Sequence, residues 1–531
     1  MNSSQAISSQ LMIAFDGREL PPDVAEWLSR RPVAGLTLFR QRNVTSAPQV
    51  RRLTDALQAA AAPDGRPLLI ATDQEGGQLI GLGDFTTPFA GAMAIGATGD
   101  ENLAERIARA TGRELRALGV NVNYAPVCDL ATNPGNPSLG IRSFGSDPAD
   151  AGRLAAATVR GLQAEGVAAT AKHFPGAGDA AVDTHHRLAV VPRSPSEMAE
   201  RELVPFRAAL GAGARLVMSG HFALPGLTGD DTLPATISRA VVTDLLRDDL
   251  SFTGLAITDA LDMKAIAQGP SHLIELLAAL RAGMDLLLTV ADPVAAAPLE
   301  IGLQQAFARG LVDRSVVDVS AGRLAELRRW LGGFTDPGLD VVGCAEHLAL
   351  AAELARRSIT LVRNDEGLLP LRLPAEARIG VVMPCPTDLT PADTSSLVAP
   401  ALSDAIRRRH GSTDAFDTPS SLGRAEISAL RDRLAGYDLL VVGTISADLQ
   451  PAQAELANAL LQLSQPTVTV ALRTPWDLAA YPQARTHVCS FGILEPTIEA
   501  LAGAMFGEEP FQGHLPVGLG DLYPRGHGLT A

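Results

Sequence analysis

The chain has 531 residues, 44 Lys and Arg against 59 Asp and Glu, a formal net charge of −15 and 46 % hydrophobic residues. This composition excludes a disordered chain and argues against nucleic-acid and anionic-membrane binding, which need clustered basic side chains. No stretch approaches the ~18 apolar residues of a membrane span, and the N-terminus lacks a signal-peptide pattern. The four cysteines form no CxxC pair, so neither a disulfide framework nor a zinc site follows. We therefore expect a cytoplasmic protein of two or three domains that acts on a small molecule without a cofactor.

The first 330 residues alternate short apolar runs, typical of buried strands, with longer segments of helical pattern. The apolar runs are Gln10–Phe15, Gly35–Phe39, Pro67–Thr72, Asn121–Val127, Val167–Lys172, Arg215–Ser219, Gly254–Thr258 and Asp285–Thr289. Helical patterns lie at Asn102–Leu118, Asp150–Glu165 and Ser196–Ala212. Eight strands separated by helices predict a (β/α)8 barrel over residues 1–335, with a doubly wound open sheet as the alternative.

A second α/β unit follows a break in this pattern. Gly332–Leu348 is rich in Gly, Pro and Asp, which predicts a linker at residues 336–357. Strand-like runs resume at Ser358–Val362, Ile379–Met383, Leu439–Thr444 and Thr467–Leu472, and helical patterns lie at Arg424–Ala435 and Ala452–Leu463. Residues 358–531 are therefore predicted to form a smaller α/β sandwich domain.

Polar residues follow the predicted barrel strands at the points where the strands end. They are Asp16, Asp73, Asp129, Lys172 with His173, His221 and Asp259. Any one aspartate after a strand can be the N-cap of the next helix. Because the strand ends of a barrel meet at its C-terminal rim, so many polar ends favour a polar active site there, and favour the barrel over the open sheet.

The loop after the fifth run carries a candidate acid/base pair. Ala171–Val191 contains Pro175, Gly176 and Gly178, which exclude a helix start, and it includes Asp183-Thr184-His185. A carboxylate two residues from an imidazole can reach it in a tight loop, fix its tautomer and favour its protonated form, as a general acid/base near neutral pH requires. A solvated loop with incidental histidines is the alternative.

Two further stretches carry candidate carboxylates. Asp259 ends an apolar strand and is a candidate nucleophile, with an N-cap role equally plausible from this residue alone. Asp73 and Glu75 lie beside Gly76-Gly77, where paired acids suit hydrogen bonding to sugar hydroxyls. No phosphate-binding loop of the GxxxxGK[ST] type is present.

A metal-dependent barrel hydrolase is an alternative from a different class. Its ligands would be Asp73, His173, His185, His221 and Asp259. Such barrels commonly take an HxH pair from the first strand, where this chain has Phe15-Asp16, so metal-free acid/base and nucleophile chemistry is favoured.

Taken together, these stretches resemble glycoside hydrolase family 3, and specifically its β-N-acetylglucosaminidase branch. The similarity rests on four blocks in the first domain and two in the second. They are DQEGG at Asp73–Gly77, NYAPVCD…RSFGSDP at Asn123–Pro148, KHFPGAG…DTH at Lys172–His185, PAT…TDALDM at Pro234–Met263, SITLVRND at Ser358–Asp365 and FGEEPFQGHLPV at Phe506–Val517.

The resemblance implies a retaining, two-step glycosidase. Asp259 matches its nucleophile, His185 its acid/base and Asp183 the carboxylate partner of that histidine. Positions that match sugar-binding or pocket-lining residues are Asp73, Arg142, Lys172, His173 and His221. The DTH loop favours an N-acetyl sugar over glucose, and phosphorolysis at the same site stays an alternative, as does a non-catalytic sugar-binding protein.

The chain departs from the family pattern at three positions near the site. Ala177 stands where many members have His, and Gln78 and Gly81 stand where Arg is usual, so positive charge is expected to be missing from one side of the pocket. Aromatic residues make up only 4 % of the chain, which favours an exo-acting pocket over a long cleft in which sugars stack on aromatic rings.

We expect a substrate such as a chitobiose-like or peptidoglycan-derived fragment. The sequence predicts no oligomeric state.

Overall fold

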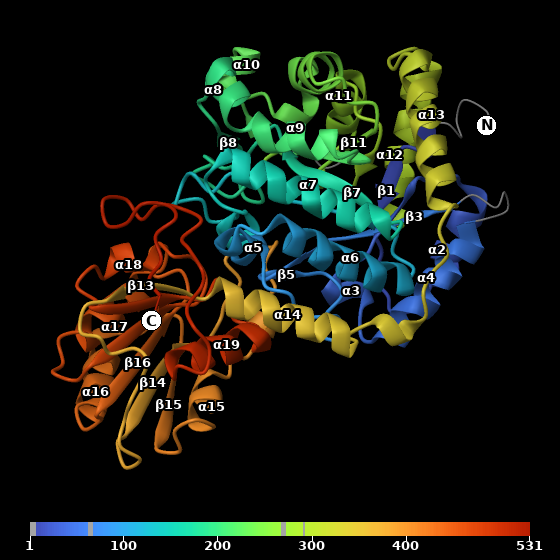
Figure 1. The fold of residues 1–531 in the computed structure, drawn as a ribbon. Coiled ribbons are helices and arrows are strands. Elements are labelled where there is room, and N and C mark those ends of the chain that lie inside the picture. Colours follow the sequence, from blue (N-terminus) through green and yellow to red (C-terminus); the bar gives the residue numbers. More distant parts are fainter. Residues whose placement is uncertain (1–6, 62–66, 267–271, 290–292, 531) are drawn as a thin grey trace.

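Eight parallel strands form the first sheet of the protein, in the order β11–β9–β7–β6–β3–β2–β1–β12. The computed structural model describes residues 7–61, 67–266, 272–289 and 293–530. The strands are β1 (Leu11–Ile13), β2 (Gly35–Thr37), β3 (Leu69–Thr72), β6 (Val122–Asn123), β7 (Ala168–Phe174), β9 (Leu216–Ser219), β11 (Leu255–Thr258) and β12 (Leu287–Leu288). A bridge between Ile257 and Leu286 joins the first and last strands of this order. The predicted (β/α)8 barrel is therefore confirmed (Figure 1). Seven of the strands lie within a predicted apolar run, and β7 extends two residues beyond its run, to Phe174.

The helices of the first domain surround this barrel (Figure 1). They include α2 (Pro22–Arg30), α3 (Arg40–Asn43), α4 (Ala47–Ala61), α5 (Ala92–Thr98), α6 (Glu101–Ala117), α7 (Pro148–Ala164), α8 (Pro195–Glu200), α9 (Leu203–Gly211), α10 (Pro225–Thr228), the π-helix η3 (Ala240–Asp249), α11 (Leu273–Ala282), α12 (Pro293–Ala308) and α13 (Arg314–Leu331). Short 3₁₀ turns η1 (Gly140–Arg142) and η2 (Ala235–Ile237), and small strands β4 (Gln74–Gly76), β5 (Leu79–Ile80), β8 (Ala189–Val190) and β10 (Phe222–Ala223), belong to the connecting loops. Within the described residues, no helix is both long and apolar enough to cross a membrane.

One predicted helix is divided in two. The pattern at Ser196–Ala212 is observed as α8 and α9, with a break at Arg201. Pro205 explains the break, because proline has no N–H to donate and its ring clashes with the carbonyl four residues earlier.

Helix α13 closes the N-terminal end of the barrel. Leu324, Leu327 and Leu331 on this helix share one buried cluster with residues such as Leu69 and Leu255, which begin their strands. The end where the strands start is therefore filled by apolar side chains, and the end where they finish is left for polar groups.

The second domain is built on a six-stranded sheet, in the order β13–β18–β17–β16–β14–β15. Its strands are β13 (Thr360–Asn364), β14 (Ile379–Pro384), β15 (Thr413–Thr418), β16 (Leu439–Thr444), β17 (Thr467–Ala471) and β18 (Thr486–Cys489). Its helices include α15 (Leu402–Arg407), α16 (Arg424–Leu434), α17 (Pro451–Leu460), α18 (Asp477–Ala480) and α19 (Glu495–Met505). Only β13 runs antiparallel to its neighbour. Strands β15 and β18 were not predicted from the sequence, because β15 is an edge strand with several exposed residues and β18 is only four residues long.

Most of the predicted linker is helical. Helix α14 (Ala345–Ser358) buries Leu350, Ala351 and Leu354, so an amphipathic pattern was present inside the Gly- and Pro-rich surroundings. This helix packs against α19 of the second domain and α5 of the first, and it ties the two domains together (Figure 1).

Candidate active site

A pocket of about 290 Å³ opens at the C-terminal end of the barrel strands. Six of the residues predicted for the site line it: Asp73, Arg142, Lys172, His173, His185 and Asp259. The other two predicted residues, Asp183 and His221, are buried behind the lining. Asp16, which also follows a strand, has an 82 % exposed side chain and is not part of this pocket.

Alternating charges form one wall of the pocket. Arg142 donates from Nε and Nη2 to the two carboxylate oxygens of Glu75, at 2.8 and 2.9 Å. The Nζ of Lys172 lies 2.6 Å from carboxylate oxygens of both Glu75 and Asp73. The Glu75 and Lys172 side chains are 5 % and 2 % exposed, but that of Asp73 is 26 % exposed, so Asp73 presents the acceptor that a sugar hydroxyl can reach.

The ion pairs keep these buried groups charged. Burial alone would raise the pKa of Glu75, but Arg142 and Lys172 lower it to about 2. Burial would likewise lower the pKa of Lys172, and the neighbouring Asp73 and Glu75 raise it above its usual value. The wall is therefore charged at neutral pH, with each cation matched by a carboxylate.

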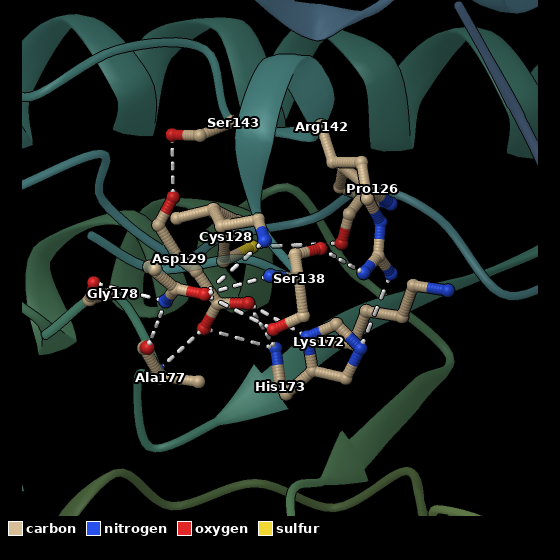
Figure 2. A network of polar contacts seen from close by, with 12 residues as sticks. Pro126, Cys128, Asp129, Ser138, Arg142, Ser143, Lys172, His173, Ala177 and Gly178 are labelled. Atoms are coloured by element: carbon tan, nitrogen blue, oxygen red, sulfur yellow. Dashed lines mark hydrogen bonds and ion pairs between the residues drawn. The ribbon is translucent and has the colours of Figure 1, made fainter. Parts of the chain in front are cut away.

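Asp129 fixes the position of His173 and of the loop that follows it. Its carboxylate accepts from His173 Nδ1 at 2.6 Å and from the Ala177 N–H at 2.7 Å, and Figure 2 shows it between these groups. The other ring nitrogen, Nε2, lies 3.5 Å from Arg142 Nη2. His173 is thereby held with its ring edge beside the charged wall.

The loop after β7 needs glycine where it passes close to other backbone. A Cβ on Gly178 would lie 2.0 Å from the Leu130 carbonyl oxygen, and Gly176 has φ of +125°. Asn136 holds the same turn from the side, because its Nδ2 donates to the Ala177 and Gly178 carbonyls at 3.0 and 3.1 Å. These contacts explain why the sequence has glycines here and no helical pattern. They also fix the path of the loop that brings Thr184 and His185 to the pocket.

Asp183 and His185 form a hydrogen-bonded pair at the pocket. Asp183 Oδ1 accepts from His185 Nδ1 at 2.7 Å and from its backbone N–H at 2.9 Å. The His185 side chain is 25 % exposed and that of Asp183 is 5 % exposed. Burial would lower the pKa of His185, but the Asp183 carboxylate raises it above its usual value. With Nδ1 held by Asp183, Nε2 is the nitrogen left to exchange a proton with a ligand.

Asp259 follows β11 and is held by its own neighbour. Its Oδ1 accepts from the Ala260 N–H at 2.8 Å. Burial would raise its pKa, but the nearby His173, His221 and His185 lower it. The carboxylate is therefore ionised at neutral pH, as an attacking group must be.

His221 supports this carboxylate from behind. Its Nε2 lies 3.0 Å from the Ala260 carbonyl oxygen, and its Nδ1 lies 2.8 Å from Thr236 Oγ1. Because a carbonyl can only accept, Nε2 carries a proton. The Thr236 hydroxyl, which also contacts the Gly220 carbonyl at 3.1 Å, holds the ring at Nδ1. Burial lowers the pKa of His221, which agrees with a neutral ring. His221 thus positions the Asp259-Ala260 peptide and does not line the pocket.

A segment of the second domain completes the pocket. Pro391, Ala392 and Thr394 are lining residues. The Thr394 N–H donates to the Gln78 carbonyl at 2.8 Å, and Thr394 Oγ1 accepts from the Ile80 N–H at 3.2 Å. The segment is therefore docked on the β4–β5 hairpin of the barrel and adds an uncharged wall.

A buried ion pair braces this segment. Arg473 Nη2 lies 3.0 Å from Asp393 Oδ2, and the two side chains are 2 % and 0 % exposed. Arg473 also donates to the Ser395 hydroxyl. The contacts of Arg473 with Asp393 and Ser395 therefore hold Pro391 and Ala392 in position at the pocket.

The three departures from the family pattern have different surroundings. Ala177 and Gly81 line the pocket. A Cβ on Gly81 would lie 2.7 Å from the Asp73 carbonyl oxygen, so the backbone leaves no room for a side chain there. Gln78 is 3 % exposed and outside the lining; its Oε1 lies 3.3 Å from the Ile141 N–H.

Several contacts that shape the site were not predicted. Glu75 and Asp129 were noted as polar residues near predicted strands inside the matched blocks, but their partners, Arg142 and Lys172 for Glu75 and His173 for Asp129, were not. Thr236 also lies in a matched block, but its partner His221 could only be found in three dimensions. For residues 391–394 no sequence signal points to the pocket, because they belong to the other domain.

The metal-dependent alternative has no ligand set in the described part of the chain. No group of three or more His, Cys, Asp or Glu side chains there is arranged to hold a metal ion. All four cysteines are free.

Comparisons with known proteins identify the family of this chain. Residues 9–327 match the N-terminal domain of glycosyl hydrolase family 3. Beta-hexosaminidase A of Pseudoalteromonas piscicida is 31 % identical over 94 % of this chain and 91 % of the relative. The family 3 β-N-acetylglucosaminidase of Paenibacillus sp. str. FPU-7 is 32 % identical, with a TM-score of 0.91 over 98 % of this chain and 99 % of that one. A beta-glucoside phosphorylase is 25 % identical, with a TM-score of 0.83 over 98 % and 95 %. The chain therefore belongs to glycosyl hydrolase family 3 and is a glycoside hydrolase.

Proposed function

We propose that the protein is a retaining, exo-acting β-N-acetylglucosaminidase. The observation that carries the proposal is the Asp183–His185 pair on a barrel loop, in which His185 Nδ1 is hydrogen-bonded to Asp183, at the same pocket as the ionised Asp259. Relatives whose names specify hexosaminidase or β-N-acetylglucosaminidase activity cover nearly the whole chain.

In the first step the Asp259 carboxylate attacks the anomeric carbon, and the bond from that carbon to the leaving oxygen breaks. His185 gives its Nε2 proton to the leaving oxygen. In the second step neutral His185 takes a proton from water, the resulting hydroxide attacks the same carbon, and the bond to Asp259 breaks. Asp73, Arg142, Lys172 and His173 bind the sugar during both steps.

The size of the pocket supports the proposed exo preference. A pocket of about 290 Å³ suits one terminal sugar, and none of its described lining residues is a tryptophan. We propose terminal GlcNAc on chitobiose-like or peptidoglycan-derived fragments as the substrate, and a cytoplasmic location, which cell fractionation with an antibody would test.

The test measures release of nitrophenol from 4-nitrophenyl β-GlcNAc and from the β-glucoside, with and without phosphate. Turnover of the GlcNAc substrate with water as acceptor, and retention of anomeric configuration by NMR, supports the proposal. Asp259→Asn is expected to abolish turnover of both substrates. His185→Ala is expected to reduce turnover of chitobiose by a factor of about 10²–10⁴ and that of the nitrophenyl substrate much less, because nitrophenol needs no proton to leave.

Phosphorolysis is the second candidate, and the beta-glucoside phosphorylase among the similar structures favours it. In that reaction phosphate replaces water in the second step, and the product is a sugar 1-phosphate. Its appearance in the phosphate arm would assign the protein as a phosphorylase. Loss of activity with a chelator would instead support a metal-dependent hydrolase, and binding without turnover a sugar-binding protein.

A further inference from the structure

A second pocket, of about 550 Å³, lies at the opposite end of the barrel from the active site. Its walls come from the end of α9, from the segment before β11 and from α13, which are labelled in the upper half of Figure 1. Arg215 and Gly254 in its lining directly precede β9 and β11, which places it where the strands begin. Its volume falls within the range of about 300–1,000 Å³ typical of small-molecule sites.

Arg215 presents an uncompensated guanidinium to this pocket. The guanidinium stacks on the ring of Trp330, 4.6 Å from its centroid. Among the described residues no carboxylate pairs with it, and its buried Nε has no hydrogen-bond partner. The backbone is held on both sides, because the Arg215 N–H donates to Gln163 Oε1 at 3.0 Å and its carbonyl accepts from the Leu255 N–H at 3.0 Å.

Two other arginines at this pocket, Arg323 and Arg247, are only partly neutralised, because they share a single carboxylate. Arg323 in the lining and Arg247 beneath it both pair with the carboxylate of Asp285, which is fully buried. One carboxylate thus serves two guanidiniums. Burial lowers the pKa of Arg247, and the neighbouring Arg323 lowers it further against the opposite effect of Asp285.

The remaining lining residues do not cancel this charge. Arg207 is exposed and donates to the Ala199 carbonyl, which is neutral. Glu326 is the one acidic residue among the described lining residues. Four arginines at or beneath the pocket therefore face two carboxylates, a surplus of two positive charges in a chain whose formal net charge is −15.

We propose that this pocket binds a phosphate group, carried either by inorganic phosphate or by a phosphorylated sugar. The guanidinium fork matches the geometry of phosphate oxygens, and a surplus of two charges matches a dianion. The hydroxyls of Ser251 and Thr253, both exposed in the lining, supply further donors. Such a site is separate from the sugar pocket and does not depend on the reaction proposed there.

Equilibrium dialysis with labelled inorganic phosphate, at constant ionic strength, tests the proposal. The full chain is expected to bind one phosphate that chloride does not displace. Arg215→Gln is expected to weaken this binding at least about tenfold, because it removes charge-assisted hydrogen bonds. Arg329→Gln is the matched control: it removes the same charge from an exposed position on α13 that is outside the pocket, and this variant is expected to bind phosphate as the wild type does.

Two further arms make the result decisive. Competition by glucose 6-phosphate distinguishes a phosphorylated sugar from the free ion as the preferred ligand. Arg207→Gln replaces an exposed side chain and is expected to weaken binding even if Arg215→Gln does not fold. Phosphate binding that both variants leave unchanged would place the phosphate elsewhere, including the active site, and would overturn the proposal, as would the absence of binding to the wild type.

Discussion

Replacing Glu75 with glutamine removes the carboxylate that Arg142 and Lys172 share. The pKa of this carboxyl falls from the usual 4.5 to about 2 in the folded protein, and at 1.36 kcal/mol per pKa unit the difference corresponds to about 3 kcal/mol of stability. Removing one partner from a buried ion pair independently costs about 3–5 kcal/mol. The two estimates of the lost free energy of unfolding agree. The physical cause is that Glu75→Gln leaves Arg142 and Lys172, both buried, with Asp73 as their one shared carboxylate.

The loss is measured as a shift in the unfolding temperature of the barrel. At about 2 °C per kcal/mol for a large domain, Glu75→Gln is expected to lower Tm at pH 7 by about 6 °C. Glu26→Gln is the control, because it breaks an ion pair with Arg30 in which both side chains are at least 60 % exposed, and such surface pairs contribute little.

The pH dependence gives a second, independent readout. Because the folded-state pKa of Glu75 is depressed, its contribution is fully present above about 4.5 and is lost as the pH falls toward 2. The difference in stability between wild type and Glu75→Gln is therefore expected to narrow below pH 4.5. Equal Tm values at pH 7, or a gap that is the same at pH 6 and pH 3, would refute the assignment of Glu75 as the shared counter-charge.

Three further substitutions probe the groups around the reacting atoms. Asp183→Asn removes the carboxylate that raises the pKa of His185, so the alkaline limb of the kcat/KM profile is expected to move to lower pH; an unmoved limb contradicts a functional pair. Thr236→Val takes away the hydroxyl that contacts His221 Nδ1 and is expected to lower kcat about tenfold with KM nearly unchanged, while Thr236→Ser restores the hydroxyl and the rate. Thr394→Val breaks the hydrogen bond from the Ile80 N–H and is expected to raise KM for chitobiose more than for the smaller nitrophenyl substrate; equal effects on both would argue that this wall does not contact the leaving group.

The barrel was predictable because its signals are local. Each of its strands coincides with a short apolar run, and most runs have a polar residue at or near their end; in a parallel barrel this order places Asp73, Lys172 and Asp259 at one rim. The loop with Asp183 and His185 was predictable for the same reason, since partners two residues apart need no tertiary information.

Contacts between distant segments were not predictable from the sequence. Gln78 was expected to alter the charge of the pocket, yet its side chain turns to the Ile141 N–H. His221 was expected to line the pocket, and its actual partners, Thr236 and the Ala260 carbonyl, come together only when three loops meet. The split between α8 and α9 could have been anticipated from Pro205, whereas nothing in the sequence connects Pro391 to a site in the other domain.

The two domains contribute different parts of the pocket: the barrel carries the reacting groups, and the second domain forms part of the opening through which ligands pass. All proposed proton-transfer and nucleophilic groups belong to the barrel, whereas the wall around Pro391 is uncharged and reaches the barrel through Thr394. A small rotation of the second domain would therefore widen the exit for the leaving group without disturbing the Asp183–His185 pair or the charged wall. Substitutions at the contact between the domains are accordingly expected to change the rate of product release and to leave the shape of the pH profile unchanged. Turnover can therefore be altered at residues that take no part in the reaction.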